Sequence, residues 1–211
     1  MSVQSALRDQ YGVVLDRKQN PAGGKSYTNY LYNRGLDQIL KKCGEETFES
    51  VIAVKSGDRE ELLGELGDVL YHVTVMLCFL DVTLNQVMEE LNRLCQETGQ
   101  SFDQLYNVIA ARRGLPVSEN GGEGSSYTAY LFQKGTDKIL KKIGEACSLM
   151  LIAAKNGDKS LVASETAGLL YHIAVMMVDQ KVTTEALAVK LDQRNGKTGN
   201  LKTFHQSDHT T

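Results

Sequence analysis

The sequence predicts an all-α fold, built as a tandem pair of small helical bundles packed on each other as a pseudo-dimer. Apolar residues recur at helical spacing through the long segments, and none shows convincing strand alternation. Proline occurs only twice among 211 residues, at Pro21 and Pro116, which permits long helices. The sequence also matches itself 100 residues further on.

The repeat is read directly from the residues. SYTNYLYNRGLDQILKKCGEE begins at Ser26, and SYTAYLFQKGTDKILKKIGEA begins at Ser126. From Ser26 to Leu94, 27 of 69 positions are identical 100 residues later. Upstream, YGVVLDRK from Tyr11 resembles YNVIAARR from Tyr106.

Two copies are too few for a solenoid, and each copy is small for an independent core. We therefore expect residues 1–97 and 98–196 to form two bundles in mutual contact. Residues 197–211 are expected to form a polar tail.

Each copy is expected to hold about four or five helices. In the first copy, Ser56-Gly57-Asp58 should break the helical pattern, with glycine at the stop and aspartate as the next N-cap. Thr83 is expected to cap a further helix. The predicted helices run from Val3 to Arg17, Leu36 to Ile52, Leu62 to Leu80, and Thr83 to Leu94.

The composition excludes several classes of protein. A net charge of −3 and a pI of about 5.8 argue against a general nucleic-acid binder. The N-terminus lacks an apolar signal core, and the apolar stretches are expected to fall short of a membrane span. None of the four cysteines forms C-x-x-C, so we expect buried, reduced thiols in a cytoplasmic protein.

Two acidic motifs stand on consecutive predicted helices. Glu45, Glu46 and Glu49 form E-E-x-x-E, and Glu65 and Asp68 form E-x-x-D. Because a short turn joins the two helices, they must run antiparallel, and the acidic sectors can face each other.

Carboxylates directed at one small volume repel each other unless a cation neutralises them. Oxygen ligands without cysteine pairs suit Mg²⁺ or Mn²⁺, which commonly bridge substrate phosphates. Lys41, Lys42 and Lys55 are candidates to hold other phosphate oxygens. A lone E-x-x-E is more often a solvated helix face, and two motifs on one hairpin weaken that alternative.

The second copy provides an internal comparison. The acids Glu46, Glu49 and Asp68 become Ala146, Leu149 and Gly168, whereas Glu45 and Glu65 persist as glutamates. His72 recurs as His172, which favours a structural hydrogen-bonding role for it. We infer that the lost acids serve chemistry rather than folding, and that the second copy is not catalytic.

SYTNYL, Gly35, ILKKCGEETFE and ELGDVLYH together resemble the phosphoribosyl-ATP pyrophosphatases of histidine biosynthesis, which are MazG-like all-α nucleotide pyrophosphatases. The resemblance implies Mg²⁺-assisted hydrolysis of the α–β phosphoanhydride of phosphoribosyl-ATP, and a homodimer that the two copies would reproduce in one chain. It implies metal binding by Glu46, Glu49, Glu65 and Asp68, with Glu45 either supporting these ligands from behind or orienting water. Ser26, Tyr27 and Thr28 are expected to bind substrate or to cap a helix.

Two other functions stay open. One is a house-cleaning pyrophosphatase for non-canonical nucleoside triphosphates. The other is a non-catalytic nucleotide-binding or regulatory relative, which the degenerate second copy suggests. In each case the expected partner is a small nucleotide, with no nucleic acid or membrane, and further self-association stays open.

Overall fold

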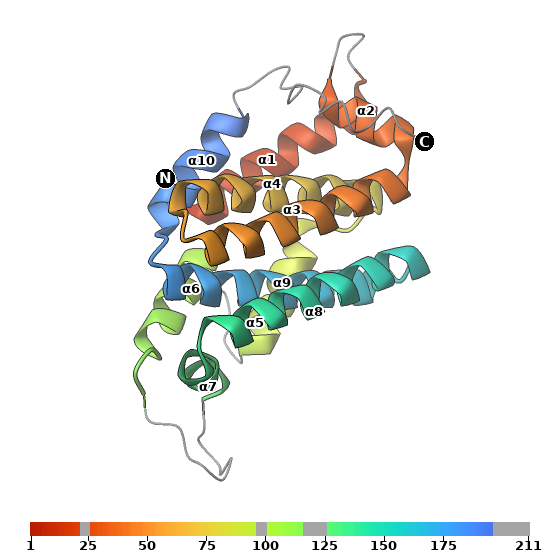
Figure 1. Ribbon diagram of the computed structural model, residues 1–211. Helices are drawn as coiled ribbons and strands as arrows, with labels where there is room; N and C mark the ends of the chain where they lie inside the picture. The colour runs from red at the N-terminus through yellow and green to blue at the C-terminus, as the bar shows by residue number, and fades with distance from the viewer. Residues whose placement is uncertain (22–25, 96–100, 116–125, 196–211) are drawn as a thin grey trace.

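The computed structural model describes residues 1–21, 26–95, 101–115 and 126–195, and within these ranges all regular structure is α-helical (Figure 1). The expected all-α class is confirmed. The described part of the first copy holds five helices: α1 (Val3–Gln19), α2 (Tyr27–Arg34), α3 (Leu36–Ser56), α4 (Arg59–Phe79) and α5 (Leu84–Cys95). The described part of the second also holds five: α6 (Phe102–Ala111), α7 (Tyr127–Lys134), α8 (Thr136–Asn156), α9 (Lys159–Gln180) and α10 (Thr184–Asn195). The expected boundary between residues 97 and 98 and the tail from 197 lie outside the described residues.

The hairpin of α3 and α4 forms where the sequence predicts it. Gly57 ends α3 in the left-handed conformation, with φ 74°, which a residue without Cβ adopts readily. Asp58 caps α4, because its side chain accepts a hydrogen bond from the backbone N–H of Glu61 at 2.9 Å. Gly157 and Asp158 repeat this arrangement between α8 and α9.

The short helix α2 is the element that apolar spacing does not reveal. Only Thr28 and Leu31 of its eight residues are buried, too few to form a helical pattern. Gly35 ends α2 and begins α3 at φ 83°. Its left-handed backbone lets one helix follow another without a loop.

The last helix of each copy packs on the other copy. Helix α5 lies against α9, and α10 lies against α1 and α4 (Figure 1). Helix α3 of the first copy also contacts α8 of the second. Helix α6 is tied to α1, because the carboxylate of Asp103 accepts hydrogen bonds from the backbone N–H groups of Val3 at 2.9 Å and Gln4 at 3.1 Å.

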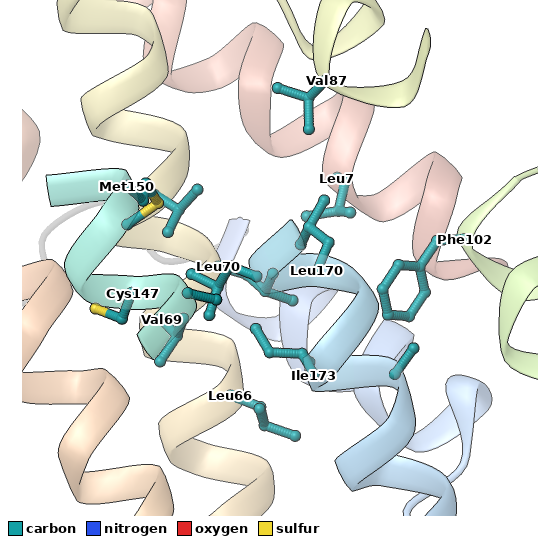
Figure 2. Packing of buried hydrophobic residues seen from close by; sticks show 14 of the residues in the cluster. Leu7, Leu66, Val69, Leu70, Val87, Phe102, Cys147, Met150, Leu170 and Ile173 are labelled. Atoms are coloured by element: carbon teal, nitrogen blue, oxygen red, sulfur yellow. The ribbon is translucent and has the colours of Figure 1, made fainter. Parts of the chain in front are cut away.

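Buried side chains of both copies form one apolar cluster. Figure 2 shows part of it, with Leu70 of α4 and Leu170 of α9 in the same packed region. All four cysteines are free; Cys43, Cys78 and Cys147 are buried and Cys95 is partly buried. Thus the expected thiols are present, three of them as core residues.

The expectation that apolar stretches are too short to span a membrane is wrong for two helices. By length and composition, α4 and α9 are both long and apolar enough. However, 78% and 67% of their most apolar windows are buried inside the protein. Both helices are therefore covered by their neighbours as core helices are, so their apolar length is weak evidence for a membrane span.

The apolar periodicity of α3 also overstates its burial. Phe48 is 53% exposed and Ile52 is 61% exposed. Leu149 and Ile152 of α8 are exposed to a similar degree. The apolar pattern therefore identifies the helix correctly but assigns two of its surface residues to the core.

Candidate active site

Three of the predicted acids converge between α3 and α4. One carboxylate oxygen each from Glu46, Glu49 and Glu65 lies within 4.8 Å of the other two. Glu46 is buried, Glu65 is half-buried and Glu49 is exposed. The cluster therefore has an anchored inner side and an outer side open to solvent. An all-oxygen, multiply charged donor set of this kind fits Mg²⁺ or Mn²⁺.

Asp68 lies on α4 one turn after Glu65 and is buried. Its carboxylate makes an ion pair with Arg194, on the last helix of the second copy. Sequence reasoning missed Arg194 altogether. When the two copies are aligned, leucine stands at the equivalent position 94 of the first copy. This difference points to Arg194 only once the packing of α10 on α4 is known.

Arg194 is held in place by more than this ion pair. Its guanidinium carbon lies 4.3 Å from the centroid of the Tyr71 ring, a cation–π contact. Burial lowers the pKa of Arg194 to about 10, and the charges of Glu46, Tyr27 and Glu65 oppose that shift. The side chain thus remains cationic at neutral pH beside the acids.

Glu45 is directed toward lysines. Its carboxylate lies 2.7 Å from Nζ of Lys42 and 3.3 Å from Nζ of Lys41. Burial raises the pKa of Glu45, but its hydrogen bonds and ion pairs with Lys42 and Lys41 outweigh burial and lower the pKa overall. In the second copy, Glu145 makes the same pairs with its lysines at 2.6 and 3.8 Å. This arrangement survives where the other acids are lost.

Lys55 has a partner in the other copy. Its Nζ lies 2.8 Å from Oδ1 of Asp137 at the start of α8. The structure does not bring Lys55 into the carboxylate cluster, so its predicted contact with phosphate has no geometric support.

The S-Y-T block divides into three roles. Ser26 is the N-cap of α2, accepting a hydrogen bond from the backbone N–H of Asn29 at 3.4 Å. Thr28 is buried, with its hydroxyl 2.8 Å from the Tyr71 hydroxyl and 3.0 Å from Nη1 of Arg17, which donates to it. Ser26 and Thr28 therefore fix α2, and only Tyr27 faces the acids.

Tyr27 reaches the acidic cluster through His72. The tyrosine hydroxyl lies 3.3 Å from Nε2 of His72, and Nδ1 of His72 lies 2.8 Å from the Asp68 carbonyl oxygen. Nδ1 of the same ring is 3.9 Å from a carboxylate oxygen of Glu46. Burial, followed by the charges of Tyr71 and Glu46, raises the pKa of Tyr27. The hydrogen-bonding role expected for His72 is confirmed.

The second copy keeps this scaffold without its acids. The Tyr127 hydroxyl lies 3.5 Å from His172, and Nδ1 of His172 lies 2.8 Å from the Gly168 carbonyl oxygen. The pair of Thr128 and Tyr171 keeps its 2.8 Å contact. The second copy thus keeps the hydrogen bonds that surround the acidic cluster in the first copy, although it lacks most of the acids.

Comparison with known proteins matches both copies of the repeat to one family. The family model described as phosphoribosyl-ATP pyrophosphohydrolase matches residues 8–94 and again residues 118–195. A phosphoribosyl-ATP pyrophosphatase of Streptococcus sanguinis (strain SK36) is 49% identical over 108 residues, covering 51% of this chain and 98% of the relative. One from Clostridium novyi (strain NT) is 43% identical over 104 residues, covering 48% of this chain and 92% of the relative. Each relative thus corresponds to about one copy.

Proposed function

Because this chain belongs to the phosphoribosyl-ATP pyrophosphohydrolase family, a family of enzymes, we propose that its first copy hydrolyses phosphoribosyl-ATP in histidine biosynthesis. Water would supply the oxygen that bonds to the α-phosphorus, and the α–β phosphoanhydride would break. The products would be phosphoribosyl-AMP and pyrophosphate. The protein would then act in the cytoplasm, with a small nucleotide as its partner.

The observation that carries the proposal is the convergence of Glu46, Glu49 and Glu65 in the first copy. Together with Asp68 they would hold Mg²⁺ or Mn²⁺. A divalent cation there supplies charge neutralisation for the polyphosphate and for the leaving pyrophosphate. Three of these four acids, Glu46, Glu49 and Asp68, are lost in the second copy.

The chain's own residues divide the remaining work. Buried Glu46 lies beside His72, with 3.9 Å between its carboxylate oxygen and Nδ1, and Tyr27 contacts the other ring nitrogen of His72. Exposed Glu49 faces the side from which substrate and water arrive. Lys41 and Lys42 are candidates for phosphate oxygens, and Glu45 orients them or the attacking water from its place between the two lysines.

The two copies would stand in the places of two subunits. Support comes from the exchange of terminal helices, in which α5 covers α9 and α10 covers α4. Relatives about half as long as this chain also fit a single copy. The second copy would then be a non-catalytic partner retained for the interface.

The test is turnover of phosphoribosyl-ATP beside dUTP, dCTP and ATP, each with Mg²⁺ and with EDTA. We expect phosphoribosyl-ATP to be hydrolysed fastest and only with the metal. Faster turnover of an ordinary triphosphate would instead establish a house-cleaning pyrophosphatase. No turnover of any of the four by a folded, metal-loaded protein would favour a non-catalytic relative.

A further inference from the structure

The last helix of the second copy brings two cations to the acids of the first. Arg194 is ion-paired with Asp68 and stacked on Tyr71, and its side chain keeps 25% of its exposure. Lys190 precedes it by one helical turn on the same face. A methyl group added at Gly67 would lie 3.3 Å from Cγ of Lys190, and one at Gly64 would lie 3.9 Å from its Nζ. The lysine therefore extends across α4 beside the acidic residues.

The equivalent place in the other half has lost both partners together. Where α5 covers α9, the position matching Arg194 is Leu94 and the position matching Lys190 is Glu90. Gly168 stands in the place of Asp68, and a methyl group added there would meet no atom within 4 Å. The two cations and the aspartate that pairs with Arg194 are thus present together at one site and absent together at the other.

A guanidinium beside a carboxylate cluster has two chemical uses. It can neutralise a carboxylate, or it can bind phosphate oxygens with its planar fork of N–H donors. Simple neutralisation does not explain why Arg194 keeps partial exposure and is stacked on an aromatic ring that fixes its plane. Both features suit a residue that presents its donors to an incoming anion.

We propose that Arg194, assisted by Lys190, is a phosphate-binding residue that the second copy contributes to the active site of the first. This rests on the proposed pyrophosphatase function, which requires a polyphosphate beside the acids. In the structure the guanidinium is paired with Asp68. If Asp68 held a divalent cation, the guanidinium would be free to bind a phosphate oxygen. The degenerate copy would therefore be retained because it completes the site, in addition to covering the core.

The experiment uses the full chain and two probes, Mn²⁺ alone and inorganic pyrophosphate with Mg²⁺, both measured by calorimetry. Arg194→Ala is expected to weaken pyrophosphate binding by about 10- to 100-fold, while Mn²⁺ binds as tightly as in the wild type or more tightly. Arg194→Lys should be intermediate, and Lys190→Ala should weaken pyrophosphate binding less. Arg93→Ala, at an exposed arginine of α5, is the matched control and should change neither affinity.

Wild-type pyrophosphate affinity in Arg194→Ala would overturn the proposal, as would equal loss of Mn²⁺ and pyrophosphate binding. If Arg194→Ala does not fold, Arg194→Gln decides by the same two affinities. With phosphoribosyl-ATP, the expected defect is a raised KM that exceeds the fall in kcat. A wild-type chain that fails to hydrolyse this substrate, yet binds pyrophosphate through Arg194, would refute the proposed function and leave the anion site standing.

Discussion

Nζ of Lys55 lies 2.8 Å from Oδ1 of Asp137, joining the end of α3 to the start of α8. The relationship is repeated with the copies exchanged, because Lys155 and Asp37 form the same pair at 2.6 Å. Two equivalent contacts across one interface are the signature of a two-fold relationship. These exposed pairs contribute little energy, but they show that the copies meet through matching surfaces.

Glu49→Gln is expected to abolish activity while leaving the fold intact. Glu49 is exposed, so removing its charge costs the core nothing, but it removes one of three converging carboxylates. We expect the turnover of phosphoribosyl-ATP to fall by at least about 100-fold, with Mn²⁺ binding weakened and the circular dichroism spectrum unchanged. The control is Glu165→Gln, in the degenerate copy, which should remain fully active. Wild-type turnover in Glu49→Gln would show that the metal-site assignment is wrong.

Glu45 and Glu145 allow ion pairing to be separated from chemistry. Both pair with two lysines, and both have lowered pKa values. A lowered carboxyl pKa stabilises the folded state above the unfolded-state pKa, and this stability disappears as the pH falls through the folded-state pKa. Glu45→Gln and Glu145→Gln should therefore each lower stability slightly at pH 7 in urea unfolding, and the difference from wild type should vanish in acid.

Activity distinguishes the two variants. If Glu45 orients water or phosphate-binding lysines, Glu45→Gln should lose at least about tenfold in turnover, whereas Glu145→Gln should lose none. Equal activity in both would assign Glu45 to the ion pair alone.

Thr28→Val should destabilise the first copy. The Thr28 hydroxyl is buried between the Tyr71 hydroxyl at 2.8 Å and Nη1 of Arg17 at 3.0 Å. Valine keeps the shape but leaves both partners without this contact, at a cost of about 1–3 kcal/mol in the free energy of unfolding. Urea unfolding measures it. Thr128→Val is the comparison and should cost less, because Arg112 lies 3.5 Å from its hydroxyl. An unchanged free energy of unfolding in Thr28→Val would show that this network does not stabilise the docking of α2.

Leu149→Glu alone is expected not to create a second metal site. Ala146 and Gly168 still lack carboxylates, so the new glutamate would join only Glu165 on the facing helix. Mn²⁺ titration should give the same stoichiometry as the wild type. The triple variant Ala146→Glu, Leu149→Glu, Gly168→Asp is the positive comparison, and a Cβ added at Gly168 would meet no atom within 4 Å. An additional Mn²⁺ bound by Leu149→Glu itself would contradict the prediction.

The sequence predicts the hairpin and the convergence of its acids because both are local. The break at Gly57 and Asp58 follows from residue type, and it forces the acids of α3 and α4 toward each other. The Arg194–Asp68 pair could not be predicted in this way. It depends on α10 packing on α4 of the other copy, a choice between two alike surfaces that no local pattern encodes.

The other features that the sequence did not predict also have physical causes. Helix α2 buries too few residues for an apolar period. Phe48 keeps the helical spacing of α3 yet remains 53% exposed, because spacing gives a direction around the helix and not the presence of a neighbour there. Lys55 follows the acidic motif in sequence, but its position on α3 brings it to Asp137 instead.

Separating the copies near Gln96 is expected to leave the first half self-associating or poorly soluble. Without the second copy, α4 and α1 lose α10, and α5 loses α9, so apolar surface is exposed on both sides of the site. Two such halves can cover each other only by exchanging α5, which places Leu94 where Arg194 was. Sedimentation should therefore show a dimer or larger species with weak activity, and Leu94→Arg should raise that activity. A stable, monomeric and fully active first half would refute the pseudo-dimer. An α5-exchanged dimer that Leu94→Arg fails to improve would show that the interface forms without a trans-acting arginine.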